Sequence, residues 1–185
     1  MNLSKSLTPF AKRIFIIGTS GCGKTFLGRK LAHLLKVKFI DLDDIYWLPN
    51  WKKRPNDEFC ELVQKEVAGE SWIISGNYSK THHNIWPQAD LIIWIDLPIY
   101  LCLWRGLKRS LSRILSREKC CNGNYESLRR LLGKDSILLW IGKTHSRRRR
   151  TYQNYFTSNQ HSKTLLHLTS AHQVSKFLDN LPKIS

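Results

Sequence analysis

The chain has 185 residues, 42% of them hydrophobic, which is enough for one domain with a packed core. No apolar stretch approaches the roughly 20 residues that span a bilayer, so the composition excludes a membrane-spanning protein and predicts no membrane partner. The net charge of +16 indicates an anionic partner, and five cysteines without paired zinc spacing favour a reducing, cytoplasmic location.

Short apolar runs alternate with amphipathic helical patterns along the chain. The five strand-like runs lie at residues 13–17, 38–42, 71–75, 91–97 and 164–168. Apolar residues recur at helical spacing over 24–35, 56–68, 101–115, about 125–156 with breaks near Gly133 and Gly142, and 171–181. This alternation predicts a three-layer α/β fold, in which a parallel five-stranded sheet carries helices on both faces. We expect a single domain over residues 1–185.

The first strand is followed by a complete phosphate-binding loop of the pattern G-x-x-x-x-G-K-[ST], and a helix begins where the pattern ends. Its glycines let backbone N–H groups approach phosphates closely, and the N-terminus of the helix adds partial positive charge. Lys24 is predicted to reach the β/γ-phosphates as a catalytic residue, and the Thr25 hydroxyl to ligate Mg²⁺. The predicted site for ATP and Mg²⁺ consists of Gly18, Thr19, Ser20, Gly21, Cys22, Gly23, Lys24 and Thr25.

Carboxylates follow the second strand, at the sheet edge where doubly wound folds bind their ligands. Alternation buries Leu42 and leaves Asp43 at the mouth of the site, where it orients the metal or accepts the proton of an attacking hydroxyl. Helix capping by Asp43 or Asp44 is the structural alternative. Trp47 and Trp51 line an acceptor pocket in one interpretation and form a small cluster under a loop in the other.

Turn residues and an acid follow the third and fourth strands. Gly76 permits close approach of a substrate, and Asn77 and Tyr78 offer hydrogen bonds, although Gly-Asn is also an ordinary turn pair. Asp96 ends the fourth strand, where nucleotide-triphosphate enzymes place a carboxylate that orients Mg²⁺; in the alternative interpretation it caps the next helix. We therefore predict Asp96 as a metal ligand. The predicted acceptor-binding residues are Asp43, Trp47, Gly76, Asn77 and Tyr78.

A basic insertion separates the fourth and fifth strands. Residues 105–150 contain 14 lysines and arginines against three acids, a net charge of +11. Arg105, Arg109 and Arg113 recur every fourth residue on one helix face, and a run of arginines occupies residues 147–150. Arginines that close on a transferring phosphoryl group stabilise its transition state. We therefore predict a helical lid over about residues 113–150, with Arg105 beside the bound nucleotide.

Seven segments of the chain together resemble one group of proteins. They are IFIIGTSGCGKTFLGRKLA, IDLDDIYWLPNW, WIISGNY, ADLIIWIDLP, RGLKRSLSR, NGNYES and KDSILLWIGKTHSRRRRTY. The chain resembles the adenylate-kinase-related P-loop proteins labelled DNA topology modulation protein, close kin of the nucleoside monophosphate kinases. This resemblance implies their P-loop NTPase fold, ATP on the phosphate loop, and two lid arginines, Arg109 and Arg148, that clamp phosphates. Ser75 departs from the group's pattern, which often has an acid there, so no magnesium or acceptor role is assigned to it.

Two functions of different classes follow from these features. The first is an ATP-dependent kinase that transfers the γ-phosphoryl group of Mg-ATP to an unidentified small acceptor, a nucleotide being one candidate. The alternative is a nucleotide-dependent protein that binds DNA through the basic insertion and modulates its topology. The guanine-specifying pattern Asn-Lys-x-Asp is absent from the sequence, which favours ATP over GTP. The predicted catalytic residues are Lys24, Asp43, Arg109 and Arg148.

Overall fold

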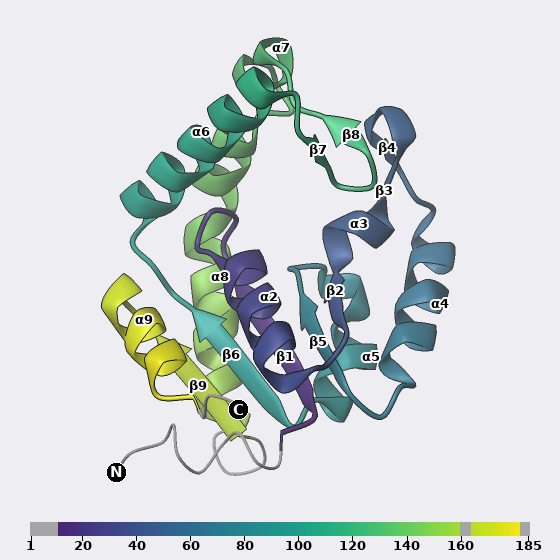
Figure 1. Cartoon of the computed structure of the whole chain (residues 1–185), viewed down its shortest axis with the longest axis vertical. Helices are drawn as coiled ribbons and strands as arrows, with labels where there is room; N and C mark the ends of the chain where they lie inside the picture. Colours follow the sequence, from purple (N-terminus) through teal and green to yellow (C-terminus); the bar gives the residue numbers. More distant parts are fainter. Residues whose placement is uncertain (1–10, 160–163, 182–185) are drawn as a thin grey trace.

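A computed structural model describes residues 11–159 and 164–181 of the chain. Its centre is a sheet of five strands, and every pair of neighbouring strands in it is parallel (Figure 1). The predicted parallel sheet is therefore confirmed, with the first strand of the chain in its middle. In spatial order the strands are β2 (Phe39–Asp41), β5 (Trp72–Ser75), β1 (Arg13–Gly18), β6 (Leu91–Ile95) and β9 (Thr164–Leu168).

Apolar side chains alternate between the two faces of the sheet, because successive residues of a strand point to opposite sides. In β1, Ile14 and Ile16 belong to one buried hydrophobic cluster, while Phe15 and Ile17 belong to the other. Helices cover both clusters and complete the predicted three-layer fold. They include α2 (Lys24–Leu35) and α9 (Ala171–Asp179) on the first face, and α4 (Asn56–Val67) and α5 (His82–Ile85) on the second.

Two long helices, α6 (Ile99–Ser116) and α8 (Ile137–Asn159), carry most of the insertion between β6 and β9 (Figure 1). The predicted break near Gly133 is confirmed, because the short helix α7 (Leu128–Leu132) ends there. The predicted break near Gly142 is wrong, and α8 runs through this glycine. Its neighbours at positions 141, 144 and 145 are buried, and this packing outweighs the roughly 1 kcal/mol that a helical glycine costs.

Short elements complete the described chain. A turn is predicted over residues 119–124, and the structure confirms it as a hairpin in which Cys121, Asn122 and Gly123 all have positive φ. In Figure 1 this hairpin arches from the top of α6 and α8 toward β3 and β4. Within the two described ranges, no helix combines the length and the apolar character needed to cross a bilayer. The short elements are α3 (Leu42–Tyr46), β3 (Trp47–Leu48), η1 (Pro49–Trp51), β4 (Lys52–Lys53), η2 (Ser79–Thr81), η3 (Trp86–Gln88), β7 (Lys119–Cys120) and β8 (Asn124–Tyr125).

His82 is a titratable group packed into the second face of the sheet. Its ring stacks on Trp86 with centroids 4.5 Å apart, and burial, reinforced by the charge of Arg148, lowers its pKa from 6.5 to about 4. Between about pH 6.5 and pH 4, His82 is protonated in the unfolded chain but neutral in the native fold. The free energy of unfolding therefore falls as the pH falls through this range.

Between about pH 7 and pH 4.5, we expect wild-type protein to lose about 2–3 kcal/mol more of its unfolding free energy than His82→Phe does. Phenylalanine keeps the aromatic stack but does not titrate. Urea unfolding at the two pH values measures the difference. The control is His83→Phe, at the exposed neighbouring position, which should behave as wild type does. An equal loss in wild type and His82→Phe would contradict the assignment.

Candidate active site

The phosphate loop joins β1 to α2 and has the conformation that its glycines predict. Gly18, Gly21 and Gly23 have φ values of 143°, 83° and 103°. A Cβ atom on Gly21 would lie 2.3 Å from the carbonyl oxygen of Cys102, so glycine is required where the loop packs against the start of α6. The loop is therefore held between the sheet edge and the base of the insertion.

Two cations lie at the phosphate loop. The ammonium group of Lys24 donates hydrogen bonds to the carbonyl oxygens of Gly18 at 2.9 Å and Thr19 at 3.1 Å. Arg105, on α6, donates from Nη1 to the carbonyl oxygen of Cys22 at 3.5 Å. Because a charged phosphate is a stronger acceptor than a neutral carbonyl, both cations have a better partner available in a nucleotide.

The carboxylate of Asp41 is hydrogen-bonded to Thr25, which the sequence predicts as a metal ligand. The Thr25 hydroxyl donates to Asp41 Oδ2 at 2.9 Å, and Asp41 Oδ1 accepts from the backbone N–H of Asp43 and so caps α3. Burial and the neighbouring charge of Asp43 raise the pKa of Asp41 to about 6. A hydroxyl and a carboxylate at this edge form a set of hard oxygen donors, which suits Mg²⁺.

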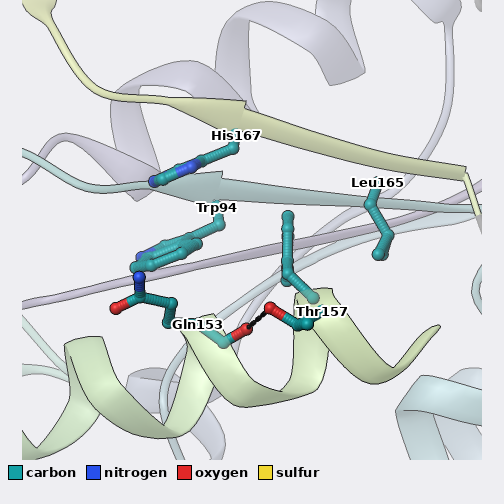
Figure 2. Close-up of a pocket in the computed structure, with 6 residues that line it drawn as sticks. Trp94, Gln153, Thr157, Leu165 and His167 are labelled. Carbon is teal, nitrogen blue, oxygen red and sulfur yellow. Dashed lines mark hydrogen bonds between the residues drawn. The ribbon is translucent and has the colours of Figure 1, made fainter. Parts of the chain in front are cut away.

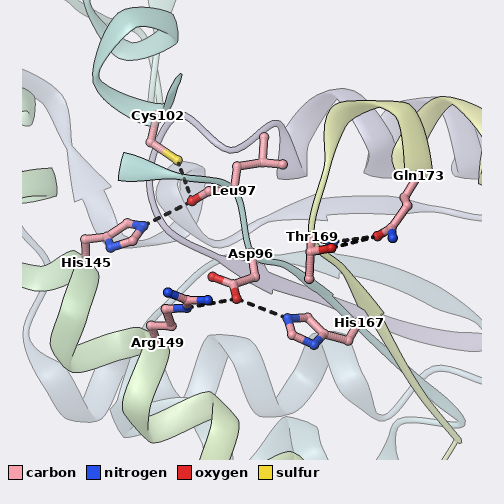
Figure 3. A network of polar contacts seen from close by, with 8 residues as sticks. All are labelled: Asp96, Leu97, Cys102, His145, Arg149, His167, Thr169 and Gln173. Atoms are coloured by element: carbon pink, nitrogen blue, oxygen red, sulfur yellow. Dashed lines mark hydrogen bonds and ion pairs between the residues drawn. The ribbon is translucent and has the colours of Figure 1, made fainter. Parts of the chain in front are cut away.

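Asp96, which the sequence predicts as a metal ligand, has other partners. Its Oδ2 accepts from Arg149 Nε at 3.1 Å and lies 3.1 Å from His167 Nε2 (Figure 3). Asp96 thus holds α8 and β9 together, and the carboxylate beside Thr25 is Asp41 instead. The metal-ligand role of Asp96 stays a prediction. The sequence contained the signal for both residues, because Asp41 ends β2 and Asp96 comes directly after β6.

Two neighbouring residues that are predicted to bind the acceptor, Asn77 and Tyr78, make hydrogen bonds to the phosphate loop and to Asp43. Asp43 Oδ1 accepts from the Tyr78 hydroxyl at 2.6 Å. Asn77 Oδ1 accepts from the N–H of Gly18 at 3.2 Å, and its Nδ2 donates to the carbonyl oxygen of Gly18. A Cβ atom on Gly76 would lie 2.6 Å from Leu42 Cβ, so this glycine lets the two segments approach. The structure therefore brings Gly76, Asn77, Tyr78 and Asp43 together.

Arg148 and Tyr152, on adjacent turns of α8, add to these contacts. The Tyr152 hydroxyl donates to Asn77 Oδ1 at 2.9 Å, and Arg148 Nη2 donates to the Asn77 carbonyl oxygen at 3.4 Å. Arg148 Nη1 is buried without a hydrogen-bond partner among the described residues. Burial lowers the pKa of Arg148, while the nearby Asp43 raises it. Sequence reasoning missed Tyr152, although its place four residues after Arg148 puts the two on one helix face.

Trp47 and Arg109 lie elsewhere. Trp47 packs against Trp51 with ring centroids 5.4 Å apart, and the guanidinium of Arg130, on α7 in the basic insertion, lies 4.0 Å from the Trp51 ring centroid. This geometry fits the small-cluster interpretation of the two tryptophans. Arg109 is exposed on α6, and no hydrogen bond or ion pair joins it to any residue of the described part of the chain. Its clamp role stays a prediction.

A separate pocket lies between α8 and the strands β6 and β9. The Trp94 ring stacks on His167 with centroids 3.9 Å apart, and the Gln153 amide lies on the other side of that ring (Figure 2). None of the residues predicted for the active site lines this pocket. The lining residues are Trp94, Gln153, Phe156, Thr157, Leu165 and His167.

Comparison with known proteins places the chain among kinases. The sequence model of the family "Shikimate kinase" matches residues 20–65, which include most of the phosphate loop and Asp41 to Asp44. The uncharacterized protein YqaC of Bacillus subtilis (strain 168) is 31% identical over 123 residues, which cover 65% of this chain and 69% of YqaC. The chain belongs to the family of YqaC, and its residues 20–65 match the shikimate kinase model. The match to the shikimate kinase model, which includes most of the phosphate loop, points to an ATP-dependent kinase.

Two further likenesses are more limited. Thermosensitive gluconokinase of Escherichia coli (strain K12) is 30% identical over 101 residues, which cover 44% of this chain and only 53% of the gluconokinase. The solved structure of shikimate kinase from Acinetobacter baumannii in complex with shikimate covers 95% of this chain and 93% of its own, with a TM-score of 0.59. At 17% identity this second likeness shows the fold, the P-loop NTPase fold predicted from the sequence.

Proposed function

We propose that this kinase transfers the γ-phosphoryl group of ATP to a hydroxyl of a small acceptor that also carries an anionic group. The observation that carries the proposal is the pair of hydrogen bonds from the neighbouring residues Tyr78 and Asn77 to Asp43 and to the phosphate loop at Gly18. These contacts connect a carboxylate that could accept the proton of a hydroxyl group with a loop that could bind a polyphosphate. A donor site and an acceptor site within one hydrogen-bonded unit are what a phosphoryl transfer requires.

On the donor side, Lys24 and Arg105 would neutralise the phosphates of ATP. The Thr25 hydroxyl and the Asp41 carboxylate would hold Mg²⁺, which when bound neutralises charge that develops on the phosphate oxygens. Asp41 must be ionised for this role, whereas burial and the charge of Asp43 raise its pKa to about 6 and so favour the protonated form. A cation beside the carboxylate would favour the ionised form again.

On the acceptor side, Asp43 would accept the proton of the attacking hydroxyl. Tyr78 holds the Asp43 carboxylate in place and stays a donor, because burial and the charge of Asp43 raise the pKa of Tyr78 well above its ordinary value. The unpartnered Nη1 of Arg148 would bind the anionic group of the acceptor or the transferring phosphoryl group. Shikimate and gluconate, the acceptors in the relatives' names, are both hydroxylated carboxylates.

The experiment that tests the proposal combines an acceptor panel with one substitution. Wild-type protein is incubated with Mg-ATP and hydroxylated acids, sugars and nucleotides, and acceptor-dependent ADP release is measured. Asp43→Asn keeps the size of the side chain but removes the base, so we expect turnover with the best acceptor to fall about 10²- to 10⁴-fold.

Asp57→Asn removes an exposed acid at the start of α4 and serves as the matched control, with turnover unchanged. Full activity in Asp43→Asn would show that Asp43 is not the base. ADP release that no acceptor of the panel stimulates would contradict the proposed kinase reaction with this class of acceptor.

The DNA-binding alternative finds no support in the comparisons, whose named relatives are kinases and the uncharacterized YqaC. The resemblance to proteins labelled DNA topology modulation protein accordingly stays a prediction. So does the cytoplasmic location, with which the free thiols of all five cysteines are in keeping.

A further inference from the structure

The lid hairpin β7–β8 is hydrogen-bonded to the segment that follows the acceptor-side carboxylate. Five hydrogen bonds join residues 122–125 to residues 44–51, although the two segments lie more than 70 positions apart in the sequence. The bonds are Asn122 N–H to Asp44 Oδ1 (3.1 Å), Asn122 Nδ2 to the Trp47 carbonyl (2.9 Å), Asn124 Nδ2 to the Leu48 carbonyl (3.0 Å), Trp51 N–H to Asn124 Oδ1 (2.8 Å) and Trp51 Nε1 to the Tyr125 carbonyl (2.9 Å).

Asn124 is the central residue of this contact. Its side chain is buried, with 4% of the residue exposed, and its amide accepts one hydrogen bond and donates two, the second to the Cys121 carbonyl at 2.6 Å. Only an amide has both a donor group and an acceptor group in this geometry. Asn122 has φ of 61°, a conformation that asparagine tolerates better than most residues do. Both positions therefore need asparagine for the contact to form.

The two tryptophans of the opposing segment are the surface on which the lid rests. Arg130, from α7, lies over the Trp51 ring at 4.0 Å and over the Trp47 ring at 5.4 Å. A guanidinium over an indole face is attracted by the negative face of the ring. The rings predicted as a possible acceptor pocket are thus in contact with the lid.

The hairpin lies close to the acceptor-side residues. Asp44, which accepts from Asn122, follows Asp43 directly in the sequence. Tyr46, in the same segment, packs on Tyr78 with ring centroids 4.6 Å apart. A displacement of the hairpin would therefore change the surroundings of the proposed base.

We propose that Asn122 and Asn124 are positioning residues that latch the lid onto residues 44–51 and so close the acceptor site against water. The latch opens to admit the acceptor and closes for transfer, which suppresses hydrolysis of ATP by water. This inference rests on the proposed kinase reaction. The contact itself, however, is tested without any acceptor.

The first test is hydrogen exchange on the full chain without ligands. Asn124→Asp keeps the size of the side chain but replaces the donor group with a carboxylate oxygen that faces two carbonyl oxygens. We expect amide exchange to speed up roughly tenfold or more in residues 119–125 and 44–51 together. Asn122→Ala, at an exposed position, gives a milder variant whose folding is not at risk. Asn154→Ala, exposed on α8, is the control.

The second test is hydrolysis of Mg-ATP with water as the only acceptor. In Asn122→Ala and Asn124→Asp we expect the rate of hydrolysis to rise several-fold while the KM for ATP stays unchanged. With the best acceptor from the panel, the KM for that acceptor should rise more than kcat falls. If the two asparagines had only a structural role, their substitution would lower the stability but would not raise the KM for the acceptor while the KM for ATP stays unchanged.

The outcomes separate the latch from the kinase reaction. Exchange that stays unchanged in both segments, or hydrolysis that falls with no change in acceptor KM, would overturn the latch. Coupled exchange of the two segments together with faster hydrolysis would support it. If wild-type protein phosphorylates no acceptor, the proposed reaction fails, but the exchange measurement and the hydrolysis measurement still decide whether the latch exists.

Discussion

Lys24→Ala is expected to lower kcat for phosphoryl transfer about 10²- to 10³-fold, the loss that follows removal of one charged or hydrogen-bonding group aimed at a developing negative charge. The Lys24 ammonium is held by the carbonyl oxygens of Gly18 and Thr19, at 2.9 and 3.1 Å. Both contacts lie at the phosphate loop itself, so a bound polyphosphate and these carbonyls compete for one cation. The lysine is therefore in position before the nucleotide arrives.

Initial rates over a range of ATP concentrations measure this effect, because kcat and the KM for ATP are obtained from the same data. Lys24→Arg keeps the charge but spreads it over a planar group, so we expect it to recover only part of the rate. Lys30→Ala, exposed on the same helix, is the matched control and should leave both constants unchanged. Wild-type kinetics in Lys24→Ala would mean that the loop binds no reacting phosphate.

The sheet and the phosphate loop were predictable because local patterns determine them. The loop is eight contiguous residues, and its position between a buried strand and an amphipathic helix identifies it. Strands such as β1 and β6 are short apolar runs, and each residue's face of the sheet follows from alternation alone.

Local patterns did not predict which of two nearby acids, Asp41 or Asp43, lies beside Thr25. Asp41 and Asp43 both follow apolar residues, and their roles depend on where β2 ends. The strand is predicted through Leu42 but ends at Asp41, because the Asp41 side chain caps α3. That capping turns the Asp41 carboxylate to Thr25 and leaves Asp43 for Tyr78. A shift of one residue in an element boundary therefore reassigns the proposed metal ligand.

The lid contacts were beyond sequence reasoning for a different reason. Asn124 and Trp51 are 73 positions apart, and no spacing rule connects a turn asparagine with a distant indole. Asn122 and Asn124 have the composition of an ordinary turn, which is all that their local sequence indicates. Their roles depend on the angle at which α6 and α8 carry the hairpin toward β3 and β4 (Figure 1).

Arg148→Ala is expected to lower kcat/KM for the acceptor about 10³-fold or more, as removal of an arginine that stabilises a transferring phosphoryl group does. Arg148 Nη1 is buried with no partner among the described residues, while Nη2 is fixed on the Asn77 carbonyl at 3.4 Å. Its guanidinium also lies 5.4 Å from the Trp140 ring centroid. The Arg148 guanidinium is thus fixed in position while its Nη1 group has no acceptor among the described residues. Binding of an anion requires such an arrangement.

Stability measurements distinguish this role from a structural one. Burial lowers the pKa of Arg148, so the charged guanidinium is less favourable in the native fold than in water. We therefore expect the unfolding free energy of Arg148→Ala to equal or exceed that of wild type while activity is lost. Arg150→Ala, exposed two residues away, should change neither quantity. A large loss of stability with unchanged kcat/KM would instead make Arg148 a structural residue. Removal of a residue that stabilises the fold lowers the unfolding free energy, whereas removal of one that only binds an anion lowers the activity.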